Sequence, residues 1–438
     1  MTDARRGRRP RFYNAAHLDH LTARAGLGPA ERLAVRAVAT VLPFRVSDYV
    51  VEELIDWDAA PDDPLYRLTF PQPDMLPRES VARIAGLLER EAPHREVAQA
   101  AAEVRRGLNP HPAGQLDLNV PRLDGEPMAG LQHKYPETVL FFPRQGQTCH
   151  SYCTYCFRWP QFVNEPALKI ATGDVERLCS YLRRHREVRN VLITGGDPMV
   201  MSTAVLAPYI DALLDDPLLD HVESIRIGTK ALSYWPHRFV SDPDADDMLK
   251  LFEKVQTRGK HLAFMAHLTH PRELETATAE RAVRRVLGTG AVIRTQSPVI
   301  RGVNDCAHAW AELWRREARL GMVPYYMFVE RDTGPRDFFA VPLVRAYEIF
   351  SDAYRSVPGL CRTVRGPVMS ATPGKVLVDG VPDIEGRRLM SLRFLQCRDP
   401  AVVNQPLFAE FDETAVWLDD LRLVIGPRRA LDLLRTHG

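Results

Sequence analysis

The chain has 438 residues, a formal charge of +1 and 45% hydrophobic residues. That length predicts two or three domains, and the balanced charge gives no electrostatic basis for binding nucleic acid or an anionic membrane. No stretch approaches the roughly 18 apolar residues of a membrane span. The arginines of residues 5–11 have no apolar run behind them, so we interpret them as a solvated lead-in and expect a cytoplasmic protein without a secretory signal.

Residues 1–125 have the pattern of a helical, loop-rich N-terminal domain. The spacing of alanine and apolar residues predicts helices over 30–39 and 79–106. We expect Ser80 to cap the second helix and Pro93 to split it into two. Between the helices, residues 56–77 contain five prolines, which predicts irregular structure.

Residues 126–340 alternate short apolar runs with helical segments. The runs predict strands at 139–143, 191–194, 225–228, 261–265, 292–296 and 323–329. The segments between them predict helices at 174–185, 203–214, 244–258, 273–287 and 307–320. Such alternation is typical of parallel βαβ units. We therefore predict an α/β fold with a partial parallel (β/α)6 barrel, whose functional site lies at the C-terminal ends of the strands.

Residues 341–438 are expected to form a small C-terminal domain that closes over the barrel. A helix is predicted over 343–357, followed by an irregular region around 366–374. Two β-like segments follow at 375–378 and 388–396, and a polar tail ends the chain.

Three of the seven cysteines, Cys149, Cys153 and Cys156, fall within eight residues. This clustering indicates a metal site rather than a disulfide framework. Structural zinc takes four ligands, and no fourth cysteine stands at the usual spacing. Three thiolates on a 4Fe-4S cluster leave one iron open to a ligand, so the spacing favours such a cluster. The alternatives are buried structural cysteines or a zinc site completed from elsewhere in the chain.

A second motif, Thr194-Gly195-Gly196-Asp197-Pro198, follows the strand predicted at 191–194. Glycines there let the backbone approach a ligand closely, although the motif alone is equally a strand-to-helix turn. With the C-x3-C-x2-C spacing and Tyr155 before the last cysteine, the chain resembles the radical S-adenosylmethionine (SAM) superfamily. The resemblance implies that the open iron binds SAM, that the Gly-Gly-Asp segment holds the SAM amino group, and that reductive cleavage yields a 5′-deoxyadenosyl radical.

Further motifs narrow this resemblance. In order and spacing they are similar to those of the lysine 2,3-aminomutase family, which the Asp62-Asp63-Pro64 segment also matches. The family usually has Arg-His where this chain has Thr154-Tyr155. The matching motifs are His133-Lys134-Tyr135-Pro136, Arg158, Arg226-Ile227-Gly228, His267, Gln296-Ser297, Arg301-Gly302-Val303-Asn304-Asp305 and Pro324-Tyr325-Tyr326.

The narrower resemblance implies an isomerase, an amino-acid 2,3-aminomutase that uses SAM together with pyridoxal 5′-phosphate (PLP). It assigns Lys375 as the lysine that binds PLP covalently and Arg158 as the clamp for the substrate α-carboxylate. It places Lys134 and Tyr135 near PLP, and His267 and Gln296 in contact with SAM. Without the resemblance, Lys375 has the pattern of a turn residue after Pro-Gly, and His267 that of a buried histidine bonded to backbone.

The substrate side chain is predicted from two positions at which this chain differs from the lysine-specific members of the family. Lysine-specific members of the family hold the distant ammonium with two aspartates, and the corresponding positions here are Arg331 and Ser370. An arginine repels an ammonium and suits a carboxylate, so we predict an acidic substrate, glutamate first. Lysine stays an alternative, because a one-residue slip would bring Asp332 into place; Arg331 would then be a solvated loop residue.

Other expectations concern partners. The lysine enzymes place a structural zinc between subunits with a cysteine like Cys306 and a C-terminal cysteine cluster, but here only Cys361 and Cys397 follow. We therefore expect no structural zinc, and a homodimer stays open. The implied electron donor is a reductase such as flavodoxin or ferredoxin.

Two further hypotheses compete. One is a radical SAM enzyme of the same fold that acts on another substrate without amino migration. The other is a non-catalytic iron-sulfur or zinc-binding interaction protein, which leaves Arg158 and the Gly-Gly-Asp motif unexplained.

Overall fold

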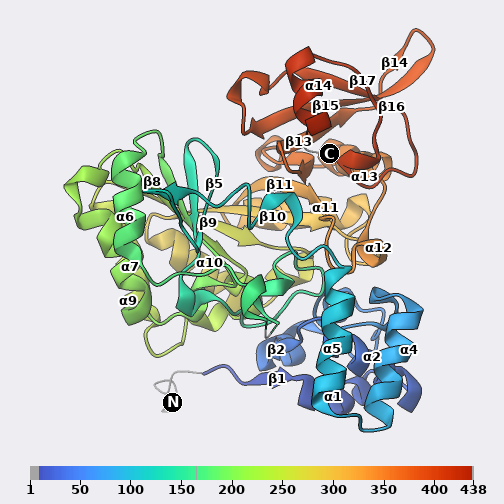
Figure 1. Ribbon diagram of the computed structural model, residues 1–438. Helices are drawn as coiled ribbons and strands as arrows, with labels where there is room; N and C mark the ends of the chain where they lie inside the picture. Colours follow the sequence, from blue (N-terminus) through green and yellow to red (C-terminus); the bar gives the residue numbers. More distant parts are fainter. Residues whose placement is uncertain (1–8, 164, 437–438) are drawn as a thin grey trace.

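The computed structural model describes residues 9–163 and 165–436. The first residues of the basic lead-in, 1–8, lie outside the described part of the chain. Figure 1 shows the N-terminal helices at one end of the molecule, the central strands and their helices in the middle, and the C-terminal strands at the opposite end. None of the described helices has the length and hydrophobicity needed to span a bilayer.

The centre is a row of six parallel strands, paired in chain order, which confirms all six predicted strands. Their apolar side chains, together with those of the intervening helices, make the largest hydrophobic cluster. The strands are β6 (Thr138–Phe141), β7 (Asn190–Ile193), β8 (Ser224–Thr229), β9 (His261–His267), β10 (Val292–Val299) and β11 (Val323–Val329).

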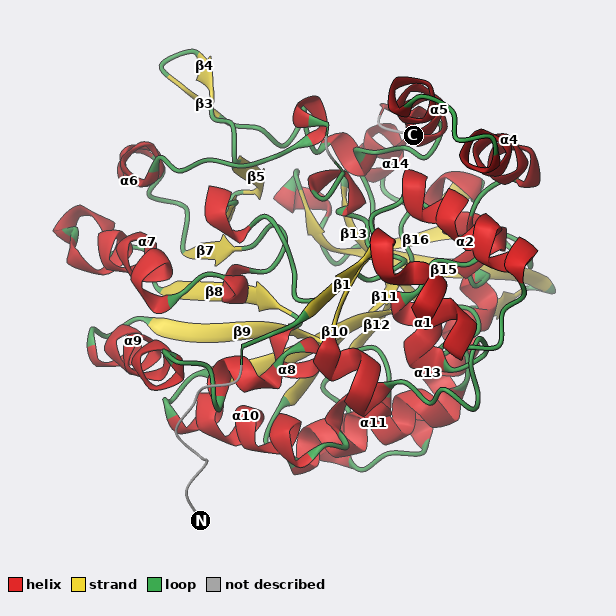
Figure 2. Cartoon of the chain, turned by 90° about the horizontal axis from the view of Figure 1, so that it is seen from below, coloured by secondary structure: helices red, strands yellow, loops and turns green. Residues whose placement is uncertain are grey.

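The helices between these strands are also confirmed, with small shifts at their ends. In Figure 2 they lie in an arc along the outer side of the strands. The site described below lies on the other face. The confirmed helices are α6 (Val175–Arg184), α7 (Thr203–Asp215), α9 (Ala245–Thr257), α10 (Ala277–Gly288) and α11 (Ala307–Arg319), whereas the short α8 (Ala231–Tyr234) was not predicted.

Further strands extend this sheet on both sides. β5 (Leu131–Tyr135) pairs antiparallel with β6, and β12 (Arg365–Ser370) pairs parallel with β11. The sheet then continues antiparallel through β13 (Gly374–Gly380), β15 (Arg387–Cys397), β16 (Pro406–Glu410) and β17 (Leu423–Ile425), with the short β14 (Asp383–Ile384) on β15. Among the described residues the strand order is an open path, so the partial barrel stays a prediction.

Two expectations for the C-terminal region were wrong. The region around 366–374 is irregular only at residues 371–373, because residues 365–370 form β12, in which Val368 and Met369 are fully buried. The tail is not merely polar, because Leu407 and Ala409 of β16 and Ala430 of α14 (Arg428–Thr436) are buried. The predicted helix at 343–357 is confirmed as α13 (Leu343–Arg355), preceded by α12 (Arg336–Phe339).

The N-terminal region is helical, as predicted, and it contacts the cysteine loop. Pro93 separates α4 (Arg78–Glu89) from α5 (His94–Arg106), which confirms the split; α1 (Leu18–Arg24) and α2 (Pro29–Val41) pack beside them. Their hydrophobic cluster includes Tyr155 and Trp159 of that loop. The two short ribbons are β1 (Phe12–Asn14) with β2 (Arg45–Ser47), and β3 (Arg122–Leu123) with β4 (Glu126–Pro127).

Two local expectations in this region were wrong. Ser80 does not cap α4, which begins two residues earlier behind Pro77. The proline-rich segment 56–77 contains a helix, α3 (Pro64–Thr69), because the Asp63 carboxylate accepts a hydrogen bond of 2.8 Å from Tyr66 N and Pro64 occupies the first turn. The domain boundaries at 125 and 340 stay predictions.

Candidate active site

One cavity of about 340 Å³ at the C-terminal ends of the parallel strands is lined by every predicted site residue. These residues come from segments more than two hundred positions apart in the sequence. They are Lys134, Tyr135, Cys149, Cys153, Cys156, Arg158, Gly195, Gly196, Asp197, His267, Gln296, Arg331, Ser370 and Lys375.

The three cysteines lie on the loop that follows β6, and the N-terminal region holds this loop. Tyr152 N donates to Arg45 O over 2.8 Å, and Thr154 N donates to Leu68 O over 2.9 Å. Burial raises the pKa of the Cys156 thiol to about 12, so a thiolate there requires a strong cationic partner.

The three cysteines line the cavity without forming a single-ion site among the described residues. Among the described residues, no three His, Cys, Asp or Glu side chains are grouped closely enough to hold a single metal ion. A cluster in which each thiolate binds a different iron holds its ligands farther apart than one ion does. Cys306 is exposed, while Cys361 and Cys397 are buried. That the protein lacks structural zinc stays a prediction.

The Gly-Gly-Asp turn after β7 packs directly against the cysteine loop. Asp197 N donates to Thr148 O over 2.7 Å, and Gly195 has a φ of +135°, which favours glycine. The Asp197 carboxylate accepts hydrogen bonds from the Thr229 hydroxyl and from Lys230 N. The carboxylate therefore fixes the turn, and all three residues of the turn line the cavity.

We expect Gly196→Ala to destabilise this junction. A Cβ at residue 196 would lie 2.4 Å from Thr148 O, a backbone atom that can move only with the whole cysteine loop. Overpacking of this kind costs about 1–3 kcal/mol, so the midpoint of thermal unfolding should fall by several degrees. Gly173→Ala is the matched control, because a Cβ there meets nothing within 4 Å. Equal midpoints for the two variants would contradict this account of the turn.

His267, at the end of β9, is fixed by a tyrosine that the sequence analysis gave no role. The Tyr155 hydroxyl lies 2.8 Å from His267 Nε2 and 2.9 Å from Thr269 Oγ1. Burial keeps the pKa of His267 well below its ordinary value, so the imidazole is neutral. Because Nε2 is already bonded, Nδ1 is the nitrogen left for a ligand. Gln296 reaches the same cavity from the neighbouring strand β10.

Lys375 lies on β13, and its amine is enclosed by polar and aromatic groups. Nζ donates to Gln396 Oε1 over 2.6 Å, and Gln396 Nε2 donates to Glu137 Oε1 over 3.1 Å. The Tyr326 ring centroid lies 4.9 Å from Nζ, and that of Tyr135 lies 5.5 Å from it. Burial, reinforced by the charge of Arg226, lowers the pKa of Lys375 to about 7. A large share of the amine is therefore neutral and nucleophilic near neutral pH.

Two arginines give part of the cavity wall a positive charge. Arg158 and Arg331 both contact the Phe157 ring, with guanidinium carbons 4.9 and 5.0 Å from its centroid. Buried atoms of these guanidiniums have no hydrogen-bond partner among the described residues, namely Arg158 Nη1 and Arg331 Nε and Nη2. Burial lowers the pKa of Lys134 to about 6, so near neutral pH this amine is mostly neutral and the positive charge comes from the two arginines. Unpaired donors in an enclosed cationic wall fit an anionic ligand.

The structure distinguishes the two adjacent candidates after β11. Arg331 lines the cavity, whereas Asp332 is not among the lining residues and its carboxylate accepts from Asn109 Nδ2 over 3.2 Å. Ser370 lines the cavity at the end of β12. Glu330 also lines it, which the sequence analysis missed; burial raises its pKa well above the ordinary range and favours the neutral acid.

Gln396 and Tyr155 were missed for different reasons. Gln396 stands opposite Lys375 in the β13–β15 pairing, and a pairing register is not visible in one sequence. Tyr155 was noted only as an aromatic residue before a cysteine, although its position within the motif was the available signal.

Comparison with known proteins finds relatives named as L-lysine 2,3-aminomutases. A protein of Aquifex aeolicus (strain VF5) named "Putative L-lysine 2,3-aminomutase" is 31% identical over 391 residues, which are 89% of this chain and 90% of the relative. The L-lysine 2,3-aminomutase of Clostridium subterminale is 29% identical over 235 residues, 54% of this chain and 53% of that protein. No family model matches the chain. Among solved structures, a radical SAM methyltransferase from Sphaerobacter thermophilus has a TM-score of 0.37 at 18% identity, over 55% of this chain and 68% of that one.

Proposed function

The chain belongs to the lysine 2,3-aminomutase family, and we propose that it is a radical SAM, PLP-dependent amino-acid 2,3-aminomutase for an acidic substrate, glutamate first. One observation carries the proposal. A single cavity joins three cysteines at iron-sulfur spacing to a lysine whose amine is partly neutral and to two unpaired guanidiniums. Neither a site made of thiols alone nor a simple anion-binding pocket needs all three kinds of group.

The described residues fit the implied cofactors. Cys149, Cys153 and Cys156 would hold the 4Fe-4S cluster, with Gly195, Gly196, Asp197, His267 and Gln296 around SAM. Lys375 would hold PLP, with Lys134 at its phosphate and Tyr135, whose buried hydroxyl has no partner among the described residues, at its ring. When bound, the cluster and SAM supply a hydrogen-abstracting radical, and PLP supplies a conjugated ring that stabilises an unpaired electron.

The chain's own residues position the substrate and protect the reaction. Arg158 would hold the α-carboxylate with a guanidinium fork, which fixes the α- and β-carbons relative to the cysteine loop. Lys375 Nζ lies beside Gln396 Oε1, which would hold its ammonium whenever the amine is free. The aromatic rings of Tyr135 and Tyr326 cover the amine and exclude water from it.

Arg331 is proposed to select the acidic side chain, with Ser370 as its neutral polar neighbour. The Arg331 guanidinium has two buried nitrogens without hydrogen-bond partners among the described residues, and a carboxylate can accept hydrogen bonds from both. The same positive charge repels the ammonium of lysine. Glu330 supplies a neutral acid beside it rather than a second negative charge.

Replacing Arg331 with glutamine is expected to lower kcat/KM for glutamate, mainly through KM. Removing one partner of a buried charge pair costs about 2–4 kcal/mol, which corresponds to roughly 30- to 1000-fold. Arg336→Gln is the matched control, because Arg336 forms its ion pair with Asp420 and is not among the cavity residues. Turnover of lysine but of neither glutamate nor aspartate by the native enzyme would overturn the acidic specificity.

Capture of PLP by the cofactor-free protein should depend on pH through Lys375. Burial depresses the pKa of this amine, so the nucleophilic form grows as pH rises and is fully present above the folded-state pKa of about 7. The rate of capture, followed by absorbance in stopped flow, should rise about tenfold per pH unit below 7 and level off above it. A capture rate that continues to rise towards pH 10, where an ordinary lysine titrates, would contradict the lowered pKa of Lys375.

The experiment that tests the proposed function begins with anaerobic reconstitution with iron, sulfide and PLP. We expect about four irons per chain, a PLP absorbance band and cleavage of SAM under reduction. A radical SAM enzyme without amino migration would cleave SAM but give no isomerised amino acid. A non-catalytic iron-sulfur or zinc-binding protein would fail at SAM cleavage.

A further inference from the structure

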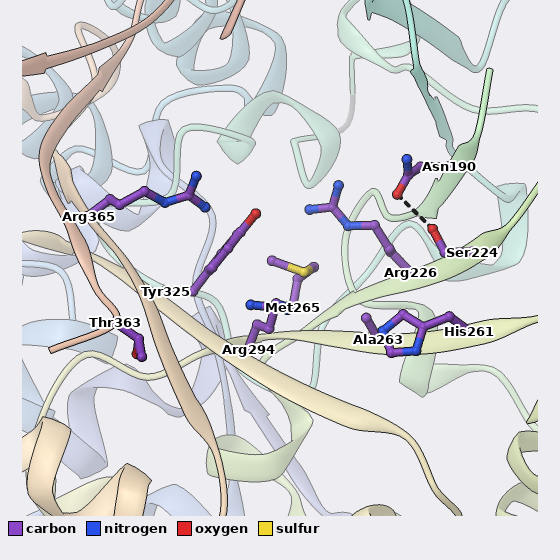
Figure 3. Close-up of a pocket in the computed structure, with 10 residues that line it drawn as sticks. All are labelled: Asn190, Ser224, Arg226, His261, Ala263, Met265, Arg294, Tyr325, Thr363 and Arg365. Carbon is purple, nitrogen blue, oxygen red and sulfur yellow. Dashed lines mark hydrogen bonds between the residues drawn. The ribbon is translucent and has the colours of Figure 1, made fainter. Parts of the chain in front are cut away.

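A second cavity, of about 510 Å³, lies at the opposite ends of the same strands. Its residues come from the starts of β7, β8 and β9, from β10 and β11, and from the start of β12 (Figure 3). Arg226 and Gly228 are two positions apart on β8 and therefore share a face, and Gly228 lines the first cavity. Arg226 and Met265 line both cavities, so they form the boundary between them.

Three arginines give this second cavity a single sign of charge. They are Arg226, Arg294 and Arg365, and its other lining residues include no aspartate or glutamate. The structure records no ion pair for these three guanidiniums with any described residue. Arg294 lies over the Tyr325 ring at 5.0 Å, and Arg365 lies 4.3 Å from the centroids of both Tyr325 and Tyr326.

The guanidiniums are arranged towards one space rather than outwards. In Figure 3, Arg226 and Arg365 extend towards one another from opposite sides, with the Tyr325 hydroxyl between them. Asn190 and Ser224, joined by a hydrogen bond of 2.7 Å, and His261 add neutral polar groups at the edge. Burial, reinforced by the charges of Arg294 and Arg365, lowers the pKa of Arg226, as expected where cations face each other without a counter-ion.

We propose that this second cavity is an anion-binding site, separate from the proposed reaction site, for a small molecule carrying phosphate or carboxylate groups. Guanidinium forks bind both groups through paired hydrogen bonds. The volume exceeds what a single phosphate needs and lies in the range of small-molecule sites, so it leaves room for an organic body. A concave site formed by strand starts does not fit an extended nucleic acid backbone.

An anion bound at this site would change the pKa of Lys375. Arg226 and Arg365 are the two charges that help to lower the pKa of that lysine. An anion bound between them offsets their charge, so the pKa of Lys375 would rise and its neutral fraction at pH 7 would fall. The bound anion would therefore slow capture of an aldehyde by this amine.

The site is tested by titrating the full-length protein with inorganic phosphate and, separately, with citrate, in a calorimeter at constant ionic strength. We expect one site per chain and at least tenfold weaker binding in the double variant Arg294→Gln, Arg365→Gln. The control is Arg281→Gln with Arg319→Gln, which removes the same charge from two exposed positions. If phosphate binds more tightly than citrate, the natural ligand is a phosphorylated molecule. If citrate binds more tightly, the natural ligand is a polycarboxylate. Equal binding by the double variant and the native protein would overturn the proposal.

Two further measurements distinguish this site from the PLP site and do not depend on the double variant. Protein already loaded with PLP should bind phosphate as well as the cofactor-free form does; loss of binding would assign the cavity to the cofactor's own phosphate and overturn a separate site. Phenylglyoxal labelling, mapped by mass spectrometry on the native chain, needs no variant. Phosphate should protect Arg294 and Arg365 at least fivefold, and absence of protection would contradict the site even if the double variant fails to fold.

Discussion

Replacing any one of Cys149, Cys153 and Cys156 with serine is expected to abolish reductive cleavage of SAM and leave the protein folded. Each thiol is only partly buried and faces the cavity, so the substitution removes little hydrophobic packing. Loss of a residue that only orients a metal ligand costs about 10- to 100-fold, and loss of a ligand itself should cost more. Iron content and 5′-deoxyadenosine formation should both fall below a hundredth of the native values.

Cys306→Ser is the control for this series, because Cys306 is exposed and does not line the cavity. It should retain both iron and SAM cleavage. A variant of the cavity cysteines that keeps four irons and cleaves SAM at the native rate would remove that cysteine from the proposed ligand set.

The second large effect is expected for Lys375→Ala. Without this amine the protein should lose its covalent PLP, and turnover should fall by about 10³-fold or more, as expected when a covalent nucleophile is deleted. Because Lys375 and the cysteines are on different segments, iron content and SAM cleavage should persist. The measurement is borohydride reduction of the PLP-loaded protein followed by peptide mass spectrometry.

The native protein should carry the pyridoxyl label on Lys375 alone. Lys169→Ala, at an exposed lysine, is the matched control and should keep the label. A Lys375→Ala protein that still carries a stoichiometric label on another lysine would refute the assignment of the PLP lysine.

The arrangement of the site could be predicted largely from the sequence because the motifs follow the strands. Cys149 lies on the loop after β6, Gly195 lies in the turn after β7 and His267 ends β9, and the ends of such parallel strands meet at one edge. Short apolar runs separated by helices were enough to fix the order of those strands. The cavity residues therefore converge although no pairing of side chains was visible in advance.

Other parts depend on side-chain direction and pairing register, which one sequence does not encode visibly. Arg331 and Asp332 are neighbours in the turn after β11, where Arg331 lines the cavity and the Asp332 carboxylate accepts from Asn109 Nδ2, so a slip of one residue exchanges a cation for an anion at the cavity. Gln396 meets Lys375 only through the register of β13 on β15. The helix α3 was missed because the Asp63 cap outweighs the prolines around it.

The central claim is that this cavity moves an amino group from the α- to the β-carbon of an amino acid. Its most direct test is incubation of the reconstituted, reduced enzyme with SAM and single amino acids, followed by separation of α- and β-isomers by NMR. The account predicts that glutamate gives its β-isomer over many turnovers with SAM conserved. Consumption of one SAM per event with no β-amino acid from any substrate would contradict it.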